Sequence, residues 1–183
     1  IFTTLPITIL LVVAVIFTTT NGAIDLSYTS SIGMGAFTFA YITNRSVNPE
    51  VLQTLGPWFV SPEAGPWVGF LAAMLVGATV GLFNSFLVLR FRLTPFIATL
   101  GVQFFMRGLI VILSDAKSIP VPFIEQTLFY KVCCGQAFAS SATQLLENNP
   151  DNGLIQFFGT LLERFPNQML WAILFFAITW VLF

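Results

Sequence analysis

The sequence predicts an all-α fold, a polytopic bundle of transmembrane helices. Of its 183 residues, 56% are hydrophobic and only 8% are charged, and the mean hydropathy is +0.88. A soluble domain carries roughly 25% charged residues, so lipid is the solvent that fits this composition. In lipid, each segment must pair its own backbone amides, which favours helices. A β-barrel would need alternating strands of about ten residues, whereas these runs are apolar all round.

About five membrane segments are expected, separated by stretches that hold nearly all of the charge. The clearest is Pro66 to Leu89, 24 residues without a charge, long enough to cross the bilayer with some tilt. The others are Leu5 to Phe17, Leu26 to Ile42, Pro95 to Leu113 and a run that begins near Met169. Because that last run is too short to span, we expect residues 1–183 to be a single transmembrane domain, a fragment truncated at both ends.

The basic residues predict the orientation of the helices. Arg90 and Arg92 lie without an acid in the short turn after the clearest helix, which the positive-inside rule places in the cytoplasm. The loops Asn44–Gly65 and 114–166 then face the extracytoplasmic side. Because structureless loops of that length are uncommon, residues 114–166 are expected to hold short helices, for instance around Gly153–Glu163.

The composition also excludes several function classes. Histidine is absent, which removes the commonest general base and the imidazole metal ligand. Cys133 and Cys134 are adjacent and have neither metal nor redox spacing, so we expect plain thiols. A net charge of −1 gives no basic field for nucleic acid. No metal site and no catalytic residue is expected.

A stripe of small residues on the 66–89 helix predicts close helix packing. Small side chains let neighbouring backbones approach where lipid supplies no hydrophobic driving force. Asn84, beside this stripe, is the one polar group there that could face a pathway. The stripe recurs at every fourth residue and consists of Gly69, Ala73, Gly77, Gly81 and Ser85.

Arg107 lies twelve residues after Pro95, well within a predicted span. An arginine near the centre of a spanning helix costs about 2.5–3.5 kcal/mol on the insertion scale. It therefore needs an acidic partner, backbone carbonyls or a water-filled cavity. Two interpretations stay open, a functional group on a pathway and an internal ion pair that fixes helix positions. Asp115 is expected to be a solvated loop acid.

A polar interruption, residues 21–27, separates the first two apolar runs. Gly22 can break a helix there, and Asp25 or Ser27 can accept the first free amides of the next helix. Half-helix ends inside a bundle are also places where transporters commonly bind solute. A plain helix cap at the membrane surface and a solute site therefore both remain open.

Four stretches, taken in order, resemble the permeases of ribose-type monosaccharide ABC importers, within a broader group that includes branched-chain amino acid permeases. They are Gly22–Ser27, Gly81–Asn84, Thr94–Gly101 and Arg107–Gly108. Each is weak alone, but order and spacing together make the resemblance specific. The family usually has Val-Gly where Tyr28-Thr29 stand, and a second Gly at position 23, so the solute stays open.

The resemblance implies a multi-pass subunit of the bacterial inner membrane that carries a sugar or sugar-like solute, ribose-type or possibly nucleoside. A second permease chain, cytoplasmic ATP-binding subunits and an extracytoplasmic solute-binding protein would be its partners. ATP and Mg would be bound by the ATPase, no cofactor would be held by this chain, and the coupling loop would lie beyond Phe183. The matching positions that would line the pathway are Asp25, Ser27, Asn84, Thr99 and Arg107.

Two other function classes compete with this interpretation. An ion channel or ion-coupled secondary transporter would need a chain of intramembrane carboxylates or histidines, and only Asp25 and Arg107 qualify. An intramembrane enzyme would need a nucleophile with a base, or a metal site, which the lone carboxylates and missing histidines argue against. No phosphate-binding loop of the G-x-x-x-x-G-K-[ST] type occurs, so ATP hydrolysis is assigned to another chain.

Overall fold

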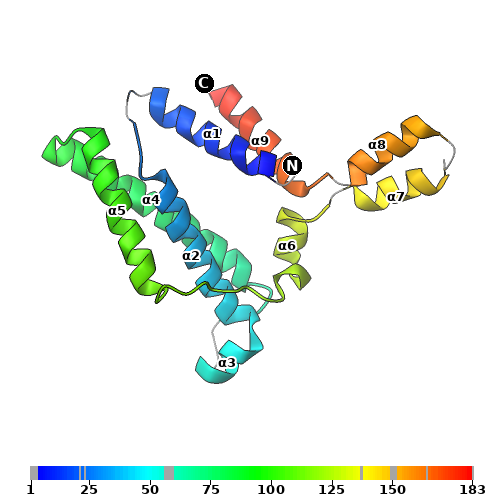
Figure 1. Cartoon of the computed structure of the whole chain (residues 1–183), viewed down its shortest axis with the longest axis horizontal. Helices are drawn as coiled ribbons and strands as arrows, with labels where there is room; N and C mark the ends of the chain where they lie inside the picture. Colours follow the sequence, from blue (N-terminus) through cyan, green and yellow to red (C-terminus); the bar gives the residue numbers. More distant parts are fainter. Residues whose placement is uncertain are drawn as a thin grey trace. The chain divides into compact units, whose positions relative to one another are not determined.

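The computed structural model describes residues 4–20, 22, 24–55, 60–136, 138–148, 152–163 and 165–182. Within them the chain forms helices, turns and connecting segments, with no strand. Asn21 and Ala23 of the expected polar interruption, and residues 56–59 of the expected first loop, lie outside the described residues. The helices, in chain order (Figure 1), are α1 (Thr4–Thr20), α2 (Tyr28–Val47), α3 (Pro49–Leu55), α4 (Gly65–Phe91), α5 (Pro95–Leu113), η1 (Ile124–Gln126), α6 (Leu128–Cys133), α7 (Ala139–Asn148), α8 (Gly153–Glu163) and α9 (Asn167–Leu182).

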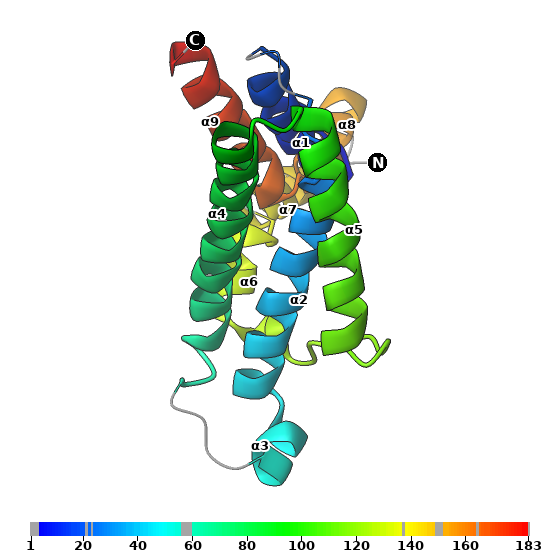
Figure 2. The ribbon, with the colours of Figure 1, turned by 90° about the vertical axis from the view of Figure 1, so that its left-hand side faces the viewer.

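The chain divides into two compact units, each described by itself. One combines Ile1–Ile16 with Leu128–Phe183 and so contains most of α1 with α6 to α9. The other, Phe17–Thr127, contains α2 to α5. In this second unit α4 and α5 flank α2, as Figure 2 shows.

A three-residue turn, Arg92 to Thr94, reverses the chain between α4 and α5. Arg92 ends α4 in the left-handed conformation, with φ 54°. Thr94 is extended, and Pro95 occupies the first turn of α5, where its missing N–H leaves no intrahelical bond unmade. The Thr94-Pro95 pair thus starts α5 at the residue that the sequence predicts.

Two helices among the described residues, α4 and α5, are long and apolar enough to cross a bilayer by length and composition. The apolar parts of α1 and α9, Leu5–Ile16 and Asn167–Val181, are shorter. α2 is 20 residues long but carries many hydroxyl and glycine residues, which make it less apolar than its neighbours. By length and composition, α4 and α5 are therefore the helices best suited to span a membrane.

The antiparallel contact of α2 with α4 depends on small residues. A side chain added at Gly69 would lie 3.0 Å from the Thr43 hydroxyl and 3.2 Å from the Phe39 carbonyl oxygen. Gly35 approaches Ala73 in the same interface, where an added Cβ would lie 3.8 Å from the alanine Cβ. Such short approaches let the two backbones gain dispersion contacts that bulkier residues would prevent.

The stretch Asn44–Gly65, expected as a loop, is partly helical. α2 continues to Val47, and α3 begins at Pro49. The Asn48 side-chain oxygen accepts a hydrogen bond from the Glu50 amide at 3.0 Å, as an N-cap does. Asn followed by Pro is a helix-start signal, so the sequence held the information for α3.

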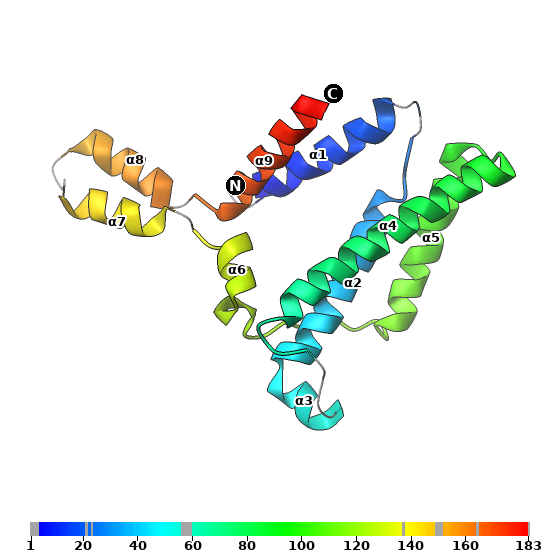
Figure 3. The same cartoon turned by 180° about the vertical axis from the view of Figure 1, so that it is seen from behind.

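Short helices also occur between α5 and α9. α8 spans Gly153–Glu163, the range in which the sequence predicts one, and α7 lies antiparallel beside it (Figure 3). Gly159 is buried against Leu146, and the Gln156 side-chain amide nitrogen donates to the Leu146 carbonyl at 3.1 Å. Asp115, after α5, is exposed and pairs with Lys117 at 2.6 Å, as expected for a solvated loop acid.

Candidate functional site

Several polar residues of the second unit lie around the break between α1 and α2. α1 ends at Thr20, and Gly22 has φ 71°, a left-handed conformation that other residues adopt only with strain. The Gly22 amide donates to the Thr19 carbonyl at 3.0 Å, which closes the end of the helix. Residues 24–26 then run without regular structure to the start of α2.

Asp25 and Ser27 form a local turn at this break. One carboxylate oxygen, Oδ1, accepts hydrogen bonds from the Ser27 amide at 2.8 Å and from the Ser27 hydroxyl at 2.7 Å. Ser27 stands at the N-cap position of α2, but its side chain caps no amide of the helix. Its carbonyl oxygen instead accepts from the hydroxyls of Ser30 and Ser31. Of the two expected caps, Asp25 accepts one amide and Ser27 accepts none.

Asn84 of α4 reaches this turn from the opposite helix. Its amide nitrogen donates to the Ser27 hydroxyl at 2.6 Å. Because the Ser27 hydroxyl accepts from Asn84 and donates to Asp25, the hydrogen bonds run in one direction, from Asn84 through Ser27 to Asp25. The side-chain oxygen of Asn84 is buried and has no partner among the described residues.

Thr99 of α5 holds the other side of the break. Its hydroxyl oxygen accepts from the Leu26 amide at 3.2 Å, and the hydroxyl donates to the Pro95 carbonyl at 2.9 Å. An amide in the irregular segment thereby gains a partner that no helix supplies. Four predicted pathway residues, Asp25, Ser27, Asn84 and Thr99, thus meet at one place.

Arg107, the fifth predicted pathway residue, does not join this group. It lies eight residues beyond Thr99 on α5 and is exposed, and its side chain makes no hydrogen bond or ion pair within the described part of the chain. The internal ion pair considered for it is therefore not formed by the described residues.

Gln103 and Thr29 are further polar residues of this site that sequence reasoning missed. The Gln103 amide nitrogen donates to the Thr29 hydroxyl oxygen at 3.2 Å and joins α5 to α2. A signal for Gln103 was present, because it lies four residues from both Thr99 and Arg107 and near the middle of a 19-residue apolar helix. Thr29 could have drawn notice as a departure from the family's usual Val-Gly.

The small-residue stripe of α4 does not lie along one packing face. Gly69 and Ala73 contact α2, whereas an added Cβ at Gly77 or Gly81 would meet nothing within 4 Å in the described structure, and Ser85 is exposed. Each step of four residues turns by about 40° on a helix of 3.6 residues per turn, so a stripe of period four drifts around it. Asn84, not Ser85, faces α2 at the end of the stripe.

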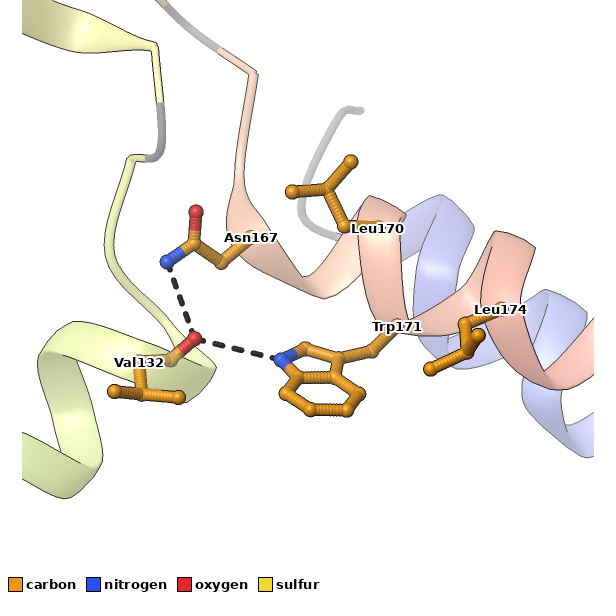
Figure 4. A pocket seen from close by; sticks show the side chains of 5 residues that line it. All are labelled: Val132, Asn167, Leu170, Trp171 and Leu174. Carbon is orange, nitrogen blue, oxygen red and sulfur yellow. Dashed lines mark hydrogen bonds between the residues drawn. The ribbon is translucent and has the colours of Figure 1, made fainter.

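A cavity of about 270 Å³ lies in the other unit, between α6 and α9. Figure 4 shows the side chains of Asn167 and Trp171 directed at the backbone carbonyl of Val132, to which they donate at 3.1 and 3.4 Å. Leu170 and Leu174 complete an otherwise apolar lining. The two donors satisfy a carbonyl near the end of α6, a structural role that leaves the cavity with little polar chemistry.

The chemistry available at the break is that of hydrogen bonding to uncharged polar groups. No cluster of three or more His, Cys, Asp or Glu that could hold a metal ion occurs in the part of the chain that the structure describes. Amide, hydroxyl and carboxylate groups do converge between α2, α4 and α5. Where groups of this kind are accessible, they suit a polar solute with several hydroxyl groups.

Comparisons with known proteins agree with the resemblance seen in the motifs. Residues 1–183 match the model of a family described as the branched-chain amino acid transport system permease component. The D-allose transport system permease protein AlsC of Escherichia coli (strain K12) is 34% identical over 112 residues. This match covers 56% of the present chain and 34% of the relative, so the chain matches about a third of that protein's length. No solved structure matches the chain.

Proposed function

The chain belongs to the family of permease components of branched-chain amino acid transport systems, and on that premise we propose that it is the translocation subunit of a bacterial ABC importer for a sugar. A relative that carries the name of a D-allose permease supports a sugar over an amino acid. Ribose-type sugars and nucleosides share the hydroxyl-rich chemistry of an aldohexose and fall within the proposal.

One observation carries this function: residues of α4 and α5 hydrogen-bond to the irregular segment between α1 and α2. Asn84 bonds Ser27, and Thr99 bonds the amide of Leu26, at residues of three of the four motifs that resemble sugar permeases. In transport proteins, irregular backbone within the membrane is tolerated where it lines a cavity, and solute binds at such breaks. The pathway is therefore proposed to pass beside the Asp25–Ser27 turn.

In the proposed topology, the whole chain is one permease domain of the inner membrane, with five membrane segments. The first four segments contain α1, α2, α4 and α5, and the fifth begins with α9, whose 16 residues are too short to span by themselves. The turn with Arg90 and Arg92 is cytoplasmic, because two arginines without an acid follow the positive-inside rule. Residues 114–166, with their short helices, then form an extracytoplasmic loop.

The proposed partners follow from the family. A second permease chain completes the pathway, cytoplasmic subunits bind ATP and Mg, and an extracytoplasmic protein delivers the solute. The chain itself acts as no enzyme and holds no cofactor in this scheme.

Reconstitution tests the proposal. The full-length protein, co-purified with its ATPase and binding protein, is placed in proteoliposomes, and uptake of radiolabelled D-allose, D-ribose, nucleosides and leucine is followed. Uptake of a sugar or nucleoside that needs both ATP and the binding protein is expected, and an ATPase variant unable to hydrolyse ATP is the control. Uptake driven by an ion gradient alone would favour the ion-coupled transporter and refute the importer.

A further inference from the structure

Three of the residues gathered at the break are shielded from any solute. Ser27, Asn84 and Thr99 expose only 1%, 7% and 4% of their surface. Each is held by short hydrogen bonds to another element of the unit, the first two to each other and the third to the Leu26 amide. Groups so buried position the backbone around them, whereas solute contact requires accessible polar atoms.

Accessible polar atoms occur on one edge of α5. Thr99, Gln103 and Arg107 follow at steps of four, and each step turns by about 40° away from the contact with α2. Their exposure rises in the same order: Thr99 is buried, Gln103 is half-buried and Arg107 is exposed. These three residues, the polar edge of α5, therefore run from the contact with α2 to the accessible surface.

The large exposed residues elsewhere on this half of α5 are apolar. Phe104, Phe105 and Ile112 of α5 are large, exposed and uncharged, as a lipid-facing surface requires. An arginine facing lipid at mid-span is costly, and an amide there loses hydrogen bonds to water. α5 thus has a surface suited to lipid and a separate edge that needs polar surroundings.

Gln103 and Thr29 together present a matched acceptor and donor. Because the Gln103 amide nitrogen donates to the Thr29 oxygen, the carboxamide oxygen stays available as an acceptor. Thr29 is exposed, and its hydroxyl proton has no acceptor in the described structure. A sugar hydroxyl can donate to the first group and accept from the second, so the pair fits one hydroxyl group.

From these observations we propose that Gln103, oriented by Thr29, is a specificity-determining residue that reads a hydroxyl group of the passing solute. Ser27, Asn84 and Thr99 are positioning residues behind it. This inference rests on the proposed function, because it names the contact that the proposed sugar makes on its path through the permease.

The first experiment pairs side-chain deletion with hydroxyl deletion. The complete transporter in proteoliposomes, supplied with saturating binding protein, takes up an aldose that the wild type transports, or one of its monodeoxy analogues. Gln103→Leu is expected to slow uptake of the parent sugar by about tenfold, the effect of one lost hydrogen bond of ordinary strength. For one analogue, lacking the hydroxyl that Gln103 reads, wild type and variant are expected to transport at equal rates.

Controls separate recognition from folding. Thr29→Val is expected to reproduce the pattern of Gln103→Leu, whereas Thr79→Val is expected to change nothing, because the exposed Thr79 hydroxyl bonds only the Leu75 carbonyl of its own helix. An equal reduction for every analogue in Gln103→Leu would show a structural role and overturn the inference. Wild-type transporter without ATP-dependent uptake of any aldose or nucleoside would instead overturn the proposed function, and the inference with it.

A second experiment measures accessibility in a Cys133→Ser/Cys134→Ser background. Gln103→Cys is expected to react with a membrane-impermeant thiol reagent and to be protected by the transported sugar. Phe104→Cys, on the apolar surface of the same helix, is expected to stay unreactive. Reaction at position 104 without reaction at 103 would place the polar edge away from the pathway and overturn the inference.

Discussion

Asn84 of α4 donates a 2.6 Å hydrogen bond to the hydroxyl of Ser27, 57 residues earlier in the chain. The bond joins two helices at a point where both side chains are buried. It therefore connects the break between α1 and α2 to a helix long enough to span the membrane, and its removal is the most direct test of the site.

Asn84→Ala is expected to destabilise the protein by about 1 kcal/mol, because the Ser27 hydroxyl loses a donor within the bundle. The thermal midpoint of the detergent-solubilised chain, followed by fluorescence-detected gel filtration, measures the effect. Asn148→Ala, at an exposed position near the end of α7, serves as the control and is expected to leave the midpoint unchanged. Equal midpoints for both variants would show that the Asn84–Ser27 bond contributes nothing.

Gly69→Leu is expected to lower the yield of folded protein strongly. An added Cβ would already lie 3.0 Å from the Thr43 hydroxyl, and the remaining carbons have no room in the α2 contact. Overpacking of this kind costs about 1–3 kcal/mol or more. Gly77→Leu is the matched control, because nothing lies within 4 Å of the added Cβ there. If the two variants fold equally well, the α2–α4 contact is not formed as described.

Arg107→Leu is expected to reduce solute uptake by about tenfold while the thermal midpoint of the chain stays near that of wild type. The side chain has no partner among the described residues, so its loss removes no internal bond, but it removes a charged donor from the polar edge of α5. Arg107→Lys is expected to retain part of the uptake, since the charge remains. Wild-type uptake in the leucine variant would show that this charge is unimportant for transport.

Replacing both Asn167 and Trp171 is expected to loosen α6. Their side chains donate to the Val132 carbonyl, which the double variant Asn167→Leu/Trp171→Phe leaves without these partners. Faster hydrogen–deuterium exchange of the amides of residues 128–133 is the expected readout. Trp180→Phe, at an exposed position of α9, is the control. Unchanged exchange in the double variant would mean that α9 does not hold α6.

Cys133 is expected to react slowly with iodoacetamide. Burial raises the pKa of its thiol, and the neighbouring Cys134 adds to the increase. The thiolate is the reactive form, so a raised pKa leaves less of it at neutral pH, and the labelling rate should keep rising with pH where an ordinary thiol has levelled off. The same residue in protein unfolded by SDS provides the reference. Identical pH profiles in folded and unfolded protein would contradict the shift.

Local signals predicted much of the helical framework. α5 begins and ends where the sequence places it, because Thr94-Pro95 opens a helix and the polar Ser114-Asp115 pair closes the apolar run. α3 lies in a stretch that the sequence analysis treats as a loop because it is charged and contains proline. The Asn48-Pro49 pair is nevertheless a helix-start signal. The period-four stripe on α4 predicts one packing face, an approximation that drifts by about 160° over four steps on a helix of 3.6 residues per turn.

The candidate site was predictable in its residues but not in its contacts. Asp25, Ser27, Asn84 and Thr99 were named from motifs, and the structure brings them together through hydrogen bonds between helices. A local sequence pattern does not show whether Asn84 or Ser85 faces α2, because that depends on how the two helices are rotated about their axes. Gln103 was overlooked because a single glutamine in an apolar helix matched no motif.

The hydrogen-bond partners of the segment around the break lie far downstream in the sequence, which has a consequence for biogenesis. These partners are translated late. Ser27 and Thr29 accept hydrogen bonds from residues 57 and 74 positions downstream, and the Leu26 amide donates to a hydroxyl 73 positions downstream. In the proposed topology, the segment between α1 and α2 therefore reaches the membrane before any of these groups has been translated. In that topology its polar atoms need water or the insertion machinery as partners until α5 has been translated, so we expect this short segment to be a vulnerable point in assembly.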